Sequence, residues 1–418
     1  MIGTLETRAA VAVDEGRLWG RLMTMASYGA LANGGVNRQA LSSEDIAARR
    51  QIKQWADACG FELSTDKIGN LFVRRSGSDS DAEPVLTGSH MDSQPKGGKF
   101  DGIYGVLAGL EAICALQDAG VKTRRPIEVV AWMNEEGSRF RPGVMGSSVF
   151  VDRLSIDNAL AVVDADGVTV EAALAVIREA EPDIPVRDVG FQVDSYIEAH
   201  IEQGPILEST GKTIGVVTGI QGLRWFDVEV LGREDHAGTT PLKTRKDALI
   251  AANWIVSELR RVLEDPEDVV RFTVGQFEAF PGSPNTVPGR VIFTIDLRHP
   301  DGAIIDRLST SIRATCGTEA LGCQATIRQT MDAAPTTFAD EMVATVRRHT
   351  EALGLSHMDM PSGAGHDAMH MQAICPTGMV FIPCENGISH NEAESATPGD
   401  CADGARVVAA CLAELANR

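Results

Sequence analysis

Apolar residues recur at strand spacing and at helical spacing in alternation through the first half of the chain. Strand-like runs fall at 70–75, 83–90 and 127–134. Residues 102–120, between the last two runs, are apolar at helical spacing and end at Gly120, and an earlier helix is expected from Ser42 or Ser43 to Gly60. Strands and helices in this order, with short connections, predict right-handed crossovers in a mostly parallel sheet.

The pattern changes at about Lys212 and changes back after about Met331. Between these positions, long alternating strands fall at 214–220, 224–232, 269–280 and 290–300. One helix is expected over 246–263 and another from Asp301, so this segment is typical of a separate α+β domain. The closing part of the chain has a helix near 341–354, a strand at 378–384 and a terminal helix.

We therefore expect an α/β fold in which a catalytic domain with a mostly parallel sheet is interrupted by a smaller inserted domain. The catalytic domain would comprise 1–211 and 331–418, and the inserted α+β domain 212–330. A chain of 418 residues agrees with two or three domains, and a hydrophobic content of 44% excludes a disordered or collagen-like protein.

The charge balance narrows the range of partners. The chain has 38 basic and 58 acidic residues, a net charge of −20, so its surface repels nucleic acids and anionic membranes. No signal peptide is visible at the N-terminus, and the longest apolar stretches fall well short of the ~20 residues that span a bilayer. Eight cysteines without a C-x-x-C pair favour free thiols and a cytoplasmic protein.

Candidate metal ligands lie at the ends of the predicted strands and at the start of a helix. Parallel sheets bind ligands beyond the carboxyl ends of their strands, so polar residues directly after each strand-like run are candidates. These residues are, in chain order, His90, Asp101, Glu135, Glu136, His200 and His390. Imidazoles and carboxylates in this combination are typical of a metal site.

Three imidazoles and two carboxylates suit a two-metal centre in which Asp101 bridges the ions. Such a centre polarises a carbonyl and lowers the pKa of a bound water from ~15.7 toward ~7. Glu135 and Glu136 can divide the work, because neighbouring strand residues point to opposite sides, so that one binds metal and the other takes a proton. Asp92, two residues beyond His90, would point to the same side and orient that imidazole.

Each of these residues alone has a simpler structural explanation. A single histidine at a strand end is commonly a satisfied surface or core group, and adjacent Glu135 and Glu136 can form a solvated acidic turn. Asp101 before Gly102 would ordinarily cap a helix. The joint placement of the residues favours the metal site.

Six sequence motifs occur in order between about Asn70 and His390. They read GSHMDSQPKGGKFDG, NEEGSRF, EAHIEQGPILE, DHAGTTP, SGAGHDA and GISHNEAE. With these motifs the chain resembles the amidase, hydantoinase/carbamoylase family. That family comprises metal-dependent amidohydrolases of the N-carbamoyl-L-amino acid hydrolase, β-ureidopropionase and allantoate amidohydrolase type, within the larger M20-like metallopeptidase group.

The resemblance implies two divalent metal ions per subunit. His90 and His200 would hold one ion, Glu136 and His390 would hold the other, and Asp101 would bridge them. All five ligands implied by the family are present. Zinc is the favoured metal, and manganese, cobalt or nickel are alternatives, because carboxylate and imidazole ligands suit each of them.

The resemblance also implies catalytic and substrate-binding residues. Glu135 would be the general base, and Gln203 would line the substrate pocket. His236 would stabilise the oxyanion in the partner subunit's site, because the smaller domain of this family also forms a homodimer. Asn285 and Arg298 would bind the substrate carboxylate, for which a guanidinium fork is well suited.

Structural explanations also exist for the substrate-binding candidates. Arg298 can pair with a neighbouring acid, His236 can cap its own turn, and Asn285 before Thr286 is typical of a turn. In SGAGHDA, Gly365 and His366 are further substrate-binding candidates. His366 and Asp367 would open a helix whose free amides favour anions.

The favoured function is hydrolysis of the carbamoyl group of an N-carbamoyl-L-amino acid or of N-carbamoyl-β-alanine, which releases the amino acid, ammonia and carbon dioxide. Allantoate, another ureido acid, requires the same ligands. An aminoacylase or aminopeptidase of the larger group is a second alternative, although those relatives usually have a carboxylate where this chain has His200. A third alternative, an inactive metal-bound binding protein, would require loss of a ligand or of the base.

Overall fold

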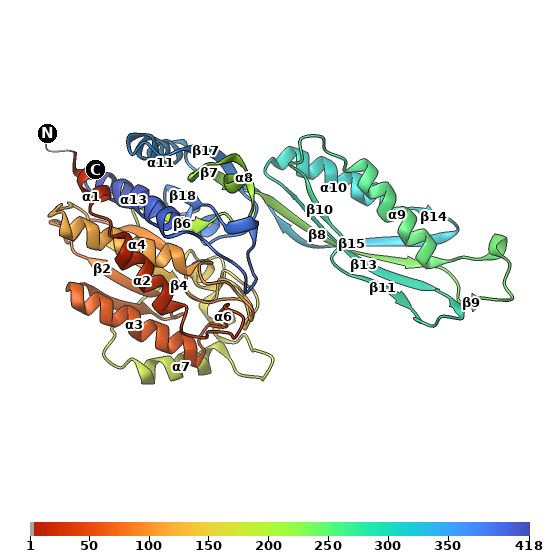
Figure 1. Ribbon diagram of the computed structural model, residues 1–418. Helices are drawn as coiled ribbons and strands as arrows, with labels where there is room; N and C mark the ends of the chain where they lie inside the picture. Colours follow the sequence, from red (N-terminus) through yellow and green to blue (C-terminus); the bar gives the residue numbers. More distant parts are fainter. Residues whose placement is uncertain (1–3) are drawn as a thin grey trace. The chain divides into compact units, whose positions relative to one another are not determined.

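The computed structural model describes residues 4–418, which form two compact units (Figure 1). Unit 1 comprises residues 4–218 and Phe338–Arg418, and unit 2 comprises Gly219–Thr337. Unit 2 is thus an insertion in the sequence of unit 1. No helix among the described residues is long and apolar enough to cross a membrane.

Unit 1 is built on a sheet with the strand order β16-β7-β18-β6-β3-β4-β2-β1-β5, and β17 pairs with β7. Its centre consists of four adjacent parallel strands, β18 (Thr377–Ile382), β6 (Ser195–Ile201), β3 (Val85–His90) and β4 (Ile127–Trp132). The outer strands are β1 (Glu62–Asp66), β2 (Leu71–Arg75), β5 (Val186–Arg187), β7 (Ile214–Ile220) and β17 (His357–Ser362). The edge strand β16 (Thr336–Thr337), which pairs with β7, consists of the last two residues of unit 2. Because β2 pairs antiparallel with β1 and β4, and β7 with β18, the sheet is mixed, and a mostly parallel sheet is not confirmed.

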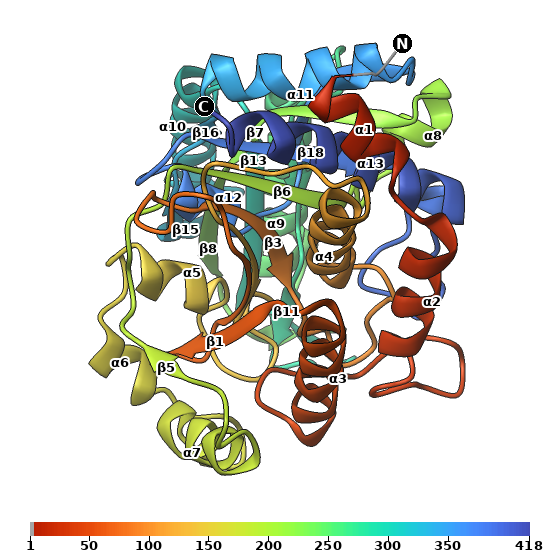
Figure 2. The same cartoon turned by 90° about the vertical axis from the view of Figure 1, so that its left-hand side faces the viewer.

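Every residue of the four central strands is buried, so both faces of the sheet centre are covered. Helix α4 (Ile103–Asp118) packs on β3 and β6, as Figure 2 shows, and α13 (Pro398–Leu415) packs on α4, β6 and β18. The remaining helices of unit 1 are α1 (Leu5–Val11), α2 (Glu15–Met25), α3 (Ser43–Cys59), α5 (Met145–Phe150), α6 (Ile156–Leu160), α7 (Val170–Ala180), α8 (Ile206–Thr210), α11 (Asp340–Ala352), α12 (Ala368–Met371) and the 3₁₀ turn η2 (Glu385–Gly387).

Most elements expected from the sequence are present in unit 1. Ser42 caps α3 by accepting a hydrogen bond from the Asp45 amide, and Gly60 ends the helix in a left-handed conformation with φ of 70°. The expected strands correspond to β2, β3, β4 and β18, and the expected later helices to α4, α11 and α13. The sequence predicts these elements because each is an apolar run of strand or helix length that is bounded by turn or cap residues.

Unit 2 contains an antiparallel sheet with the order β10-β13-β8-β15-β14, in which β11 also pairs with β13. Helices α9 (Ala248–Val262) and α10 (Gly302–Cys316) pack against this sheet (Figure 1). The strands are β8 (Gly222–Leu231), β10 (Arg271–Thr273), β11 (Phe277–Phe280), β13 (Arg290–His299), β14 (Glu319–Ala320) and β15 (Cys323–Ala333). Alternate residues of β8, including Phe226, Val228 and Val230, are buried in a core shared with the two helices.

Two details differ from the expectations based on sequence. The single strand expected over 269–280 is two short strands, β10 and β11, which pair with successive parts of β13. The strand at 214–220, placed in the inserted domain by its alternating pattern, is β7 and pairs with β18 of unit 1. Hydrophobic alternation identifies a strand but does not identify the sheet to which it is added.

Candidate metal and catalytic site

The candidate ligands come from segments at the carboxyl ends of the four parallel strands and from the start of α4. His90 is the last residue of β3, and His200 lies near the end of the neighbouring strand β6. Glu136 follows β4, and His390 lies in the segment after β18. Asp101 precedes Gly102, the N-terminal cap residue of α4. Parallel strands end at one edge of a sheet, which is why residues distant in sequence meet here.

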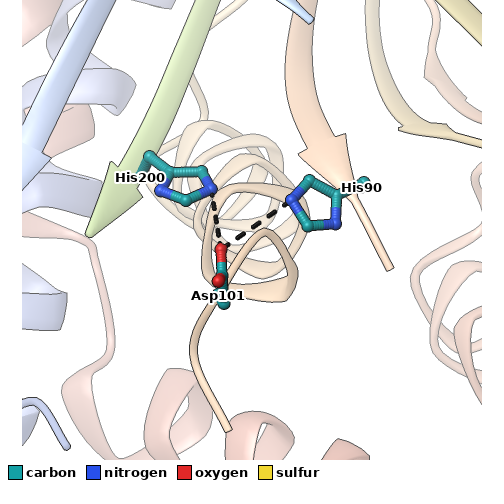
Figure 3. Close-up of side chains that lie close together, drawn as sticks. All are labelled: His90, Asp101 and His200. Atoms are coloured by element: carbon teal, nitrogen blue, oxygen red, sulfur yellow. Dashed lines mark ion pairs between the residues drawn. The ribbon is translucent and has the colours of Figure 1, made fainter. Parts of the chain in front are cut away.

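Asp101 lies between two imidazoles. Its Oδ1 atom is 3.3 Å from His200 Nε2 and 3.9 Å from His90 Nε2, and both rings point toward it in Figure 3. All three side chains are almost completely buried. These three residues form one group whose ligand atoms all lie within 4.8 Å of one another.

The other oxygen of Asp101 belongs to a second group. Asp101 Oδ2 lies 3.2 Å from His390 Nε2, which lies 3.4 Å from Glu136 Oε2. The ligand atoms of this second group also lie within 4.8 Å of one another. Asp101 is therefore shared by two potential cation sites, one with two imidazoles and one with an imidazole and a second carboxylate. The structure thus brings together the five residues that the sequence analysis names as candidate ligands.

Backbone carbonyls orient the two buried imidazoles. His90 Nδ1 donates a hydrogen bond to the Asp92 carbonyl at 2.9 Å, and His200 Nδ1 donates to the Ile201 carbonyl at 2.9 Å. Each ring is thereby held in the tautomer whose Nε2 lone pair faces Asp101. Burial lowers the pKa of His90 to about 4 and also lowers that of His200, which favours the neutral ring that metal binding requires.

The backbone around Gly102 is required for this arrangement. Gly102 has a positive φ of 66° with ψ of −54°, and a Cβ there would lie 2.2 Å from His90 Cε1. Only glycine accommodates both the conformation and the close approach of the imidazole. Asp101 is therefore not the helix cap that its position before Gly102 suggested, because Gly102 itself occupies the cap position without a side-chain bond.

Glu135 and Glu136 lie beyond β4, which ends at Trp132, so the expected strand alternation does not separate them. They follow Asn134, which has a φ of 56°, in a turn. Glu135 Oε2 lies 3.5 Å from His90 Nε2, whereas Glu136 faces His390. The turn thus directs the two carboxylates to different candidate cation sites.

Asp92 has a different contact from the one expected. Its carboxylate accepts the backbone N–H groups of Glu135 and Glu136, each at 3.2 Å, and lies 3.8 Å from His90 Nδ1. The ring of His90 is oriented by the Asp92 carbonyl instead. Sequence spacing placed Asp92 near His90 correctly but could not distinguish its carbonyl from its carboxylate.

Within residues 4–418, the buried carboxylates of this region lack a lysine or arginine side chain as an ion-pair partner, as expected of a site that binds a metal ion. Burial, together with the neighbouring carboxylates Asp367 and Glu136, raises the pKa of Glu135 well above its usual value. Burial and Asp101 raise the pKa of Glu136 to about 8. Among the described residues no lysine or arginine forms an ion pair with Asp101, Glu135 or Glu136, and Glu136 Oε1 is buried without a hydrogen-bond partner. Buried carboxylates without a protein cation are stabilised by metal ions.

Gln203 also faces the centre. Its Nε2 atom donates to Asp101 Oδ2 at 3.1 Å and to Ser389 Oγ at 3.3 Å, while its buried Oε1 has no partner. Gln203 and His390 both have positive φ, 58° and 53°, although neither is glycine. Strained backbone of this kind is concentrated at functional sites. Gln203 therefore contacts the shared carboxylate directly, a closer position than the expected pocket lining.

His366 and Asp367 lie behind His200 rather than at an anion-binding helix end. The His366 ring packs edge-on against the His200 ring, with the ring centroids 4.5 Å apart, and His366 Nε2 lies 2.9 Å from Ser362 Oγ. Asp367 accepts a hydrogen bond from Ser147. The first amide of α12 is already bound by the Glu198 carboxylate at 2.9 Å, so the expected free amides are not available to a substrate anion. Gly365, in contrast, is exposed.

Several polar residues at the site, most of them buried, were not identified from the sequence. Glu394 accepts a hydrogen bond from the backbone amide of Asp101. The Gln94 side chain donates one to Glu136 Oε2 at 2.7 Å, and the Ser89 hydroxyl donates one to the Glu198 carboxylate at 2.6 Å. Ser89, Glu198 and Glu394 lie inside the motifs GSHMDSQPKGGKFDG, EAHIEQGPILE and GISHNEAE, so the motifs contained a signal. The residue types alone are indistinguishable from surface polar residues.

The remaining candidates lie in unit 2, where β9 (Asp235–His236) pairs with β12 (Thr286–Val287). His236 is exposed, and its Nδ1 accepts the Gly238 and Thr239 amides at 3.0 and 3.1 Å. The ring proton is therefore on Nε2, where it can be donated to a ligand. Asn285 lies beside this pair, since its carbonyl accepts the Ala237 amide.

Arg298 forms an ion pair within unit 2. Its Nε and Nη2 atoms donate to the two oxygens of Asp296, each at 3.0 Å. Asp296 also accepts the Trp225 indole N–H at 2.9 Å. The alternative explanation of Arg298, pairing with a neighbouring acid, is therefore realised. A substrate carboxylate would have to share the guanidinium with Asp296.

Comparison with known proteins gives consistent results. Residues 86–414 match the profile of Peptidase family M20/M25/M40. The chain is 42% identical over 408 residues to the N-carbamoyl-L-amino-acid amidohydrolase of Rhizobium meliloti, covering 97% of each chain. It is 36% identical over 409 residues to the allantoate amidohydrolase of Escherichia coli (strain K12), covering 97% of this chain and 98% of the relative.

Solved structures show the same relationship. An amidase of the hydantoinase/carbamoylase family from Burkholderia multivorans superimposes with a TM-score of 0.91 at 44% identity, covering 97% of this chain and 98% of the other. Aminopeptidase PepT from Bacillus cereus superimposes with a TM-score of 0.65 at 16% identity, covering 97% of this chain and 100% of the other, which shows a shared fold.

Proposed function

Because the chain belongs to Peptidase family M20/M25/M40, we propose that it is a metal-dependent amidohydrolase that cleaves the carbamoyl C–N bond of N-carbamoyl amino acids. The substrate would be an N-carbamoyl-L-amino acid or N-carbamoyl-β-alanine, and the products an amino acid, ammonia and carbon dioxide. The relatives named N-carbamoyl-L-amino-acid amidohydrolase support this choice among ureido acids, since four such proteins are 36–42% identical to this chain.

The observation that carries the proposal is the position of Asp101 in both candidate cation groups, with a further carboxylate, Glu135, beside one of them. We propose that two divalent ions bind here: one through His90, His200 and Asp101, the other through Glu136, His390 and Asp101. Zinc is the favoured ion, with manganese, cobalt or nickel as alternatives. Divalent ions at these positions supply Lewis acidity toward the ureido carbonyl and increase the acidity of a neighbouring water.

The chain's own residues handle the proton. Glu135 is held in place by the hydrogen bond from its amide to Asp92 and faces His90, so it is the candidate to accept a proton from the attacking water. The same carboxyl group can then deliver the proton to the departing nitrogen. Burial raises the pKa of Glu135, which makes its carboxylate a stronger proton acceptor in the first transfer.

Unit 2 would supply the substrate-binding groups. His236 Nε2–H would stabilise charge on the ureido oxygen, and Asn285 and Arg298 would bind the substrate carboxylate. In unit 1, Gln203 and Gly365 would line the substrate site, and His366, which packs on the His200 ring, would support it from behind. We further propose that the segment Gly219–Thr337 forms a lid and a homodimer contact, so that His236 serves the partner subunit's site. A cytoplasmic location stays a prediction, supported by eight free cysteines among the described residues.

Allantoate is a second candidate substrate. The Escherichia coli relative named allantoate amidohydrolase covers nearly the whole chain at 36% identity, and the Bacillus subtilis protein of that name is 35% identical. Allantoate is also a ureido acid with a carboxylate, so the same ligands and the same base would serve it. Allantoate and an N-carbamoyl amino acid differ in the size of the group that each carries in addition to the carboxylate and the ureido group that is cleaved.

Ammonia release tests the proposal. The metal-loaded chain would be assayed with N-carbamoyl-L-methionine, N-carbamoyl-β-alanine, allantoate and an N-acetyl-L-amino acid. For each compound kcat/KM would be determined, from ammonia for the three ureido acids and from the released free amino acid for the N-acetyl compound. We expect the highest kcat/KM for one of the two carbamoyl amino acids. A higher value for allantoate would select the second candidate, and hydrolysis of the N-acetyl compound alone would contradict both.

A further inference from the structure

Glu394 joins the two loops that carry Asp101 and His390. Its carboxylate is buried, with 3% of the residue exposed. Oε1 accepts the backbone N–H of Phe100 at 2.9 Å and that of Asp101 at 3.0 Å. Oε2 accepts the hydroxyl of Ser389, the residue before His390, at 3.0 Å. One side chain therefore binds the backbone of one candidate ligand and the sequence neighbour of another.

Ser389 provides a second connection to the shared ligand. Its hydroxyl also lies 3.1 Å from Asp101 Oδ2 and accepts the amide of Gln203 at 3.3 Å. A hydroxyl has one proton, so Ser389 donates to Glu394 or to Asp101 at a given moment. Glu394 is therefore connected to Asp101 in two ways. It accepts a hydrogen bond from the backbone amide of Asp101 directly, and Ser389 links its carboxylate to the carboxylate of Asp101.

The position of Glu394 is closely constrained. A Cβ at Gly98 would lie 2.0 Å from Glu394 Oε1, so the loop backbone packs directly against the carboxylate. Among the described residues Glu394 forms no ion pair with lysine or arginine; its partners are two amides and a hydroxyl. A buried carboxylate without a cationic partner is costly, which argues for a role other than general stability.

We propose that Glu394 is a positioning residue of the metal centre. It holds the loop of Asp101 and the loop of His390 at the separation at which both side chains can bind the same ion. The inference rests on the proposed metal centre and adds a residue that does not itself bind the ion. Groups that orient metal ligands commonly change metal affinity about 10–100-fold when removed.

The two candidate ions should respond differently. His90 and His200 are anchored by carbonyls on or beside their own strands, independently of Glu394. The ion between Glu136 and His390 depends on both loops that Glu394 joins. Removal of the Glu394 side chain should therefore lower the affinity for the ion between Glu136 and His390 about 10–100-fold, and the affinity for the other ion less.

Three variants separate positioning from charge. Glu394→Ala removes the acceptor, whereas Glu394→Gln keeps an oxygen for the two amides and an NH₂ group for Ser389 but removes the charge. Glu392→Gln is the matched control, since Glu392 lies two residues away and its carboxylate contacts the exposed Asn33 side chain at 3.2 Å. Zinc affinity and stoichiometry would be measured by competition with a chromophoric chelator, and folding by circular dichroism.

We expect Glu394→Ala to retain one ion and to bind the second about 10–100-fold more weakly, and Glu394→Gln to restore most of that affinity. Equal losses in Glu394→Ala and Glu394→Gln would show that charge is responsible and overturn positioning. Unchanged affinity in Glu394→Ala would also overturn it. If Glu394→Ala does not fold, Glu394→Asp, whose carboxylate is one methylene shorter, replaces it in the same comparison. Wild-type protein that binds no divalent ion would instead overturn the metal centre, and Glu394's role with it.

Discussion

The imidazole of His90 lies directly against the backbone of Gly102, so that a Cβ on residue 102 would come within 2.2 Å of the ring. Gly102 follows Asp101, the residue shared by both candidate cation groups. One glycine thus permits a histidine at the end of β3 and a carboxylate at the start of α4 to approach a common point. The geometry of the centre depends on a position that has no side chain.

Gly102→Ala should therefore displace His90 and weaken metal binding. Gly211→Ala is a control for positive φ, because Gly211 has φ of 62° and ψ of 35° and a Cβ there would meet no atom within 4 Å. An alanine in this left-handed region costs about 1–2 kcal/mol. Gly102, with ψ of −54°, has a different backbone conformation, and the collision with His90 is specific to it. Comparable zinc stoichiometry in the two purified variants would contradict this explanation.

Chelation should abolish hydrolysis while leaving the fold intact. The ligands lie on a sheet edge whose strands are buried throughout, so the apolar core does not depend on the ions. Metal loss should lower the melting temperature, since free ion at about 1,000 times its Kd contributes about 4 kcal/mol. Far-ultraviolet circular dichroism before and after chelation measures the fold. Global unfolding at room temperature would show that the ions are structural.

The sequence indicated the candidate ligands in two ways. His90, Glu136 and His390 follow recognisable strands and Asp101 precedes a recognisable helix, whereas His200 was found through the run EAHIEQGPILE. Glu394 was missed because a glutamate in the run NEAE has the composition of a solvated loop. Its burial arises only when Gly98, Phe100 and Asp101 pack on it. The separation of Glu135 and Glu136 was expected for the wrong reason, since a turn at Asn134 and the carboxylate of Asp92 produce it. Long-range packing of this kind has no local pattern.

A pH-dependent contribution to stability is expected from Glu414 on α13. Burial opposes ionisation, but hydrogen bonds from Arg418, Arg348 and His349 outweigh it and lower the pKa of Glu414 to about 2. A carboxyl whose pKa is lower in the folded state stabilises the protein above its unfolded pKa of about 4.3 and loses that effect as the pH falls toward about 2. The difference in melting temperature between wild type and Glu414→Gln should be constant above about pH 5 and shrink below about pH 4. A difference independent of pH would contradict the assignment.

The proposed role of His236 in a partner subunit has a distinct signature. Glu135→Gln and His236→Ala chains should each be inactive alone, but a mixed dimer would contain one site with both residues. Random exchange at equal amounts makes half of the dimers mixed, so activity should recover to about a quarter of wild type. If subunit exchange is demonstrated and the mixture stays inactive, His236 does not act across the dimer.

The central claim is that Glu136 binds a metal ion while its neighbour Glu135 transfers a proton, and parallel measurement of metal content and kcat in two variants tests it most directly. Glu135→Gln should retain two ions per subunit and lose about 10²–10⁴-fold in kcat, because only the base is removed. Glu136→Gln should lose one ion as well as activity, since its carboxylate completes the group with Asp101 and His390. Equal metal content in the two variants, or full activity in Glu135→Gln, would contradict the account.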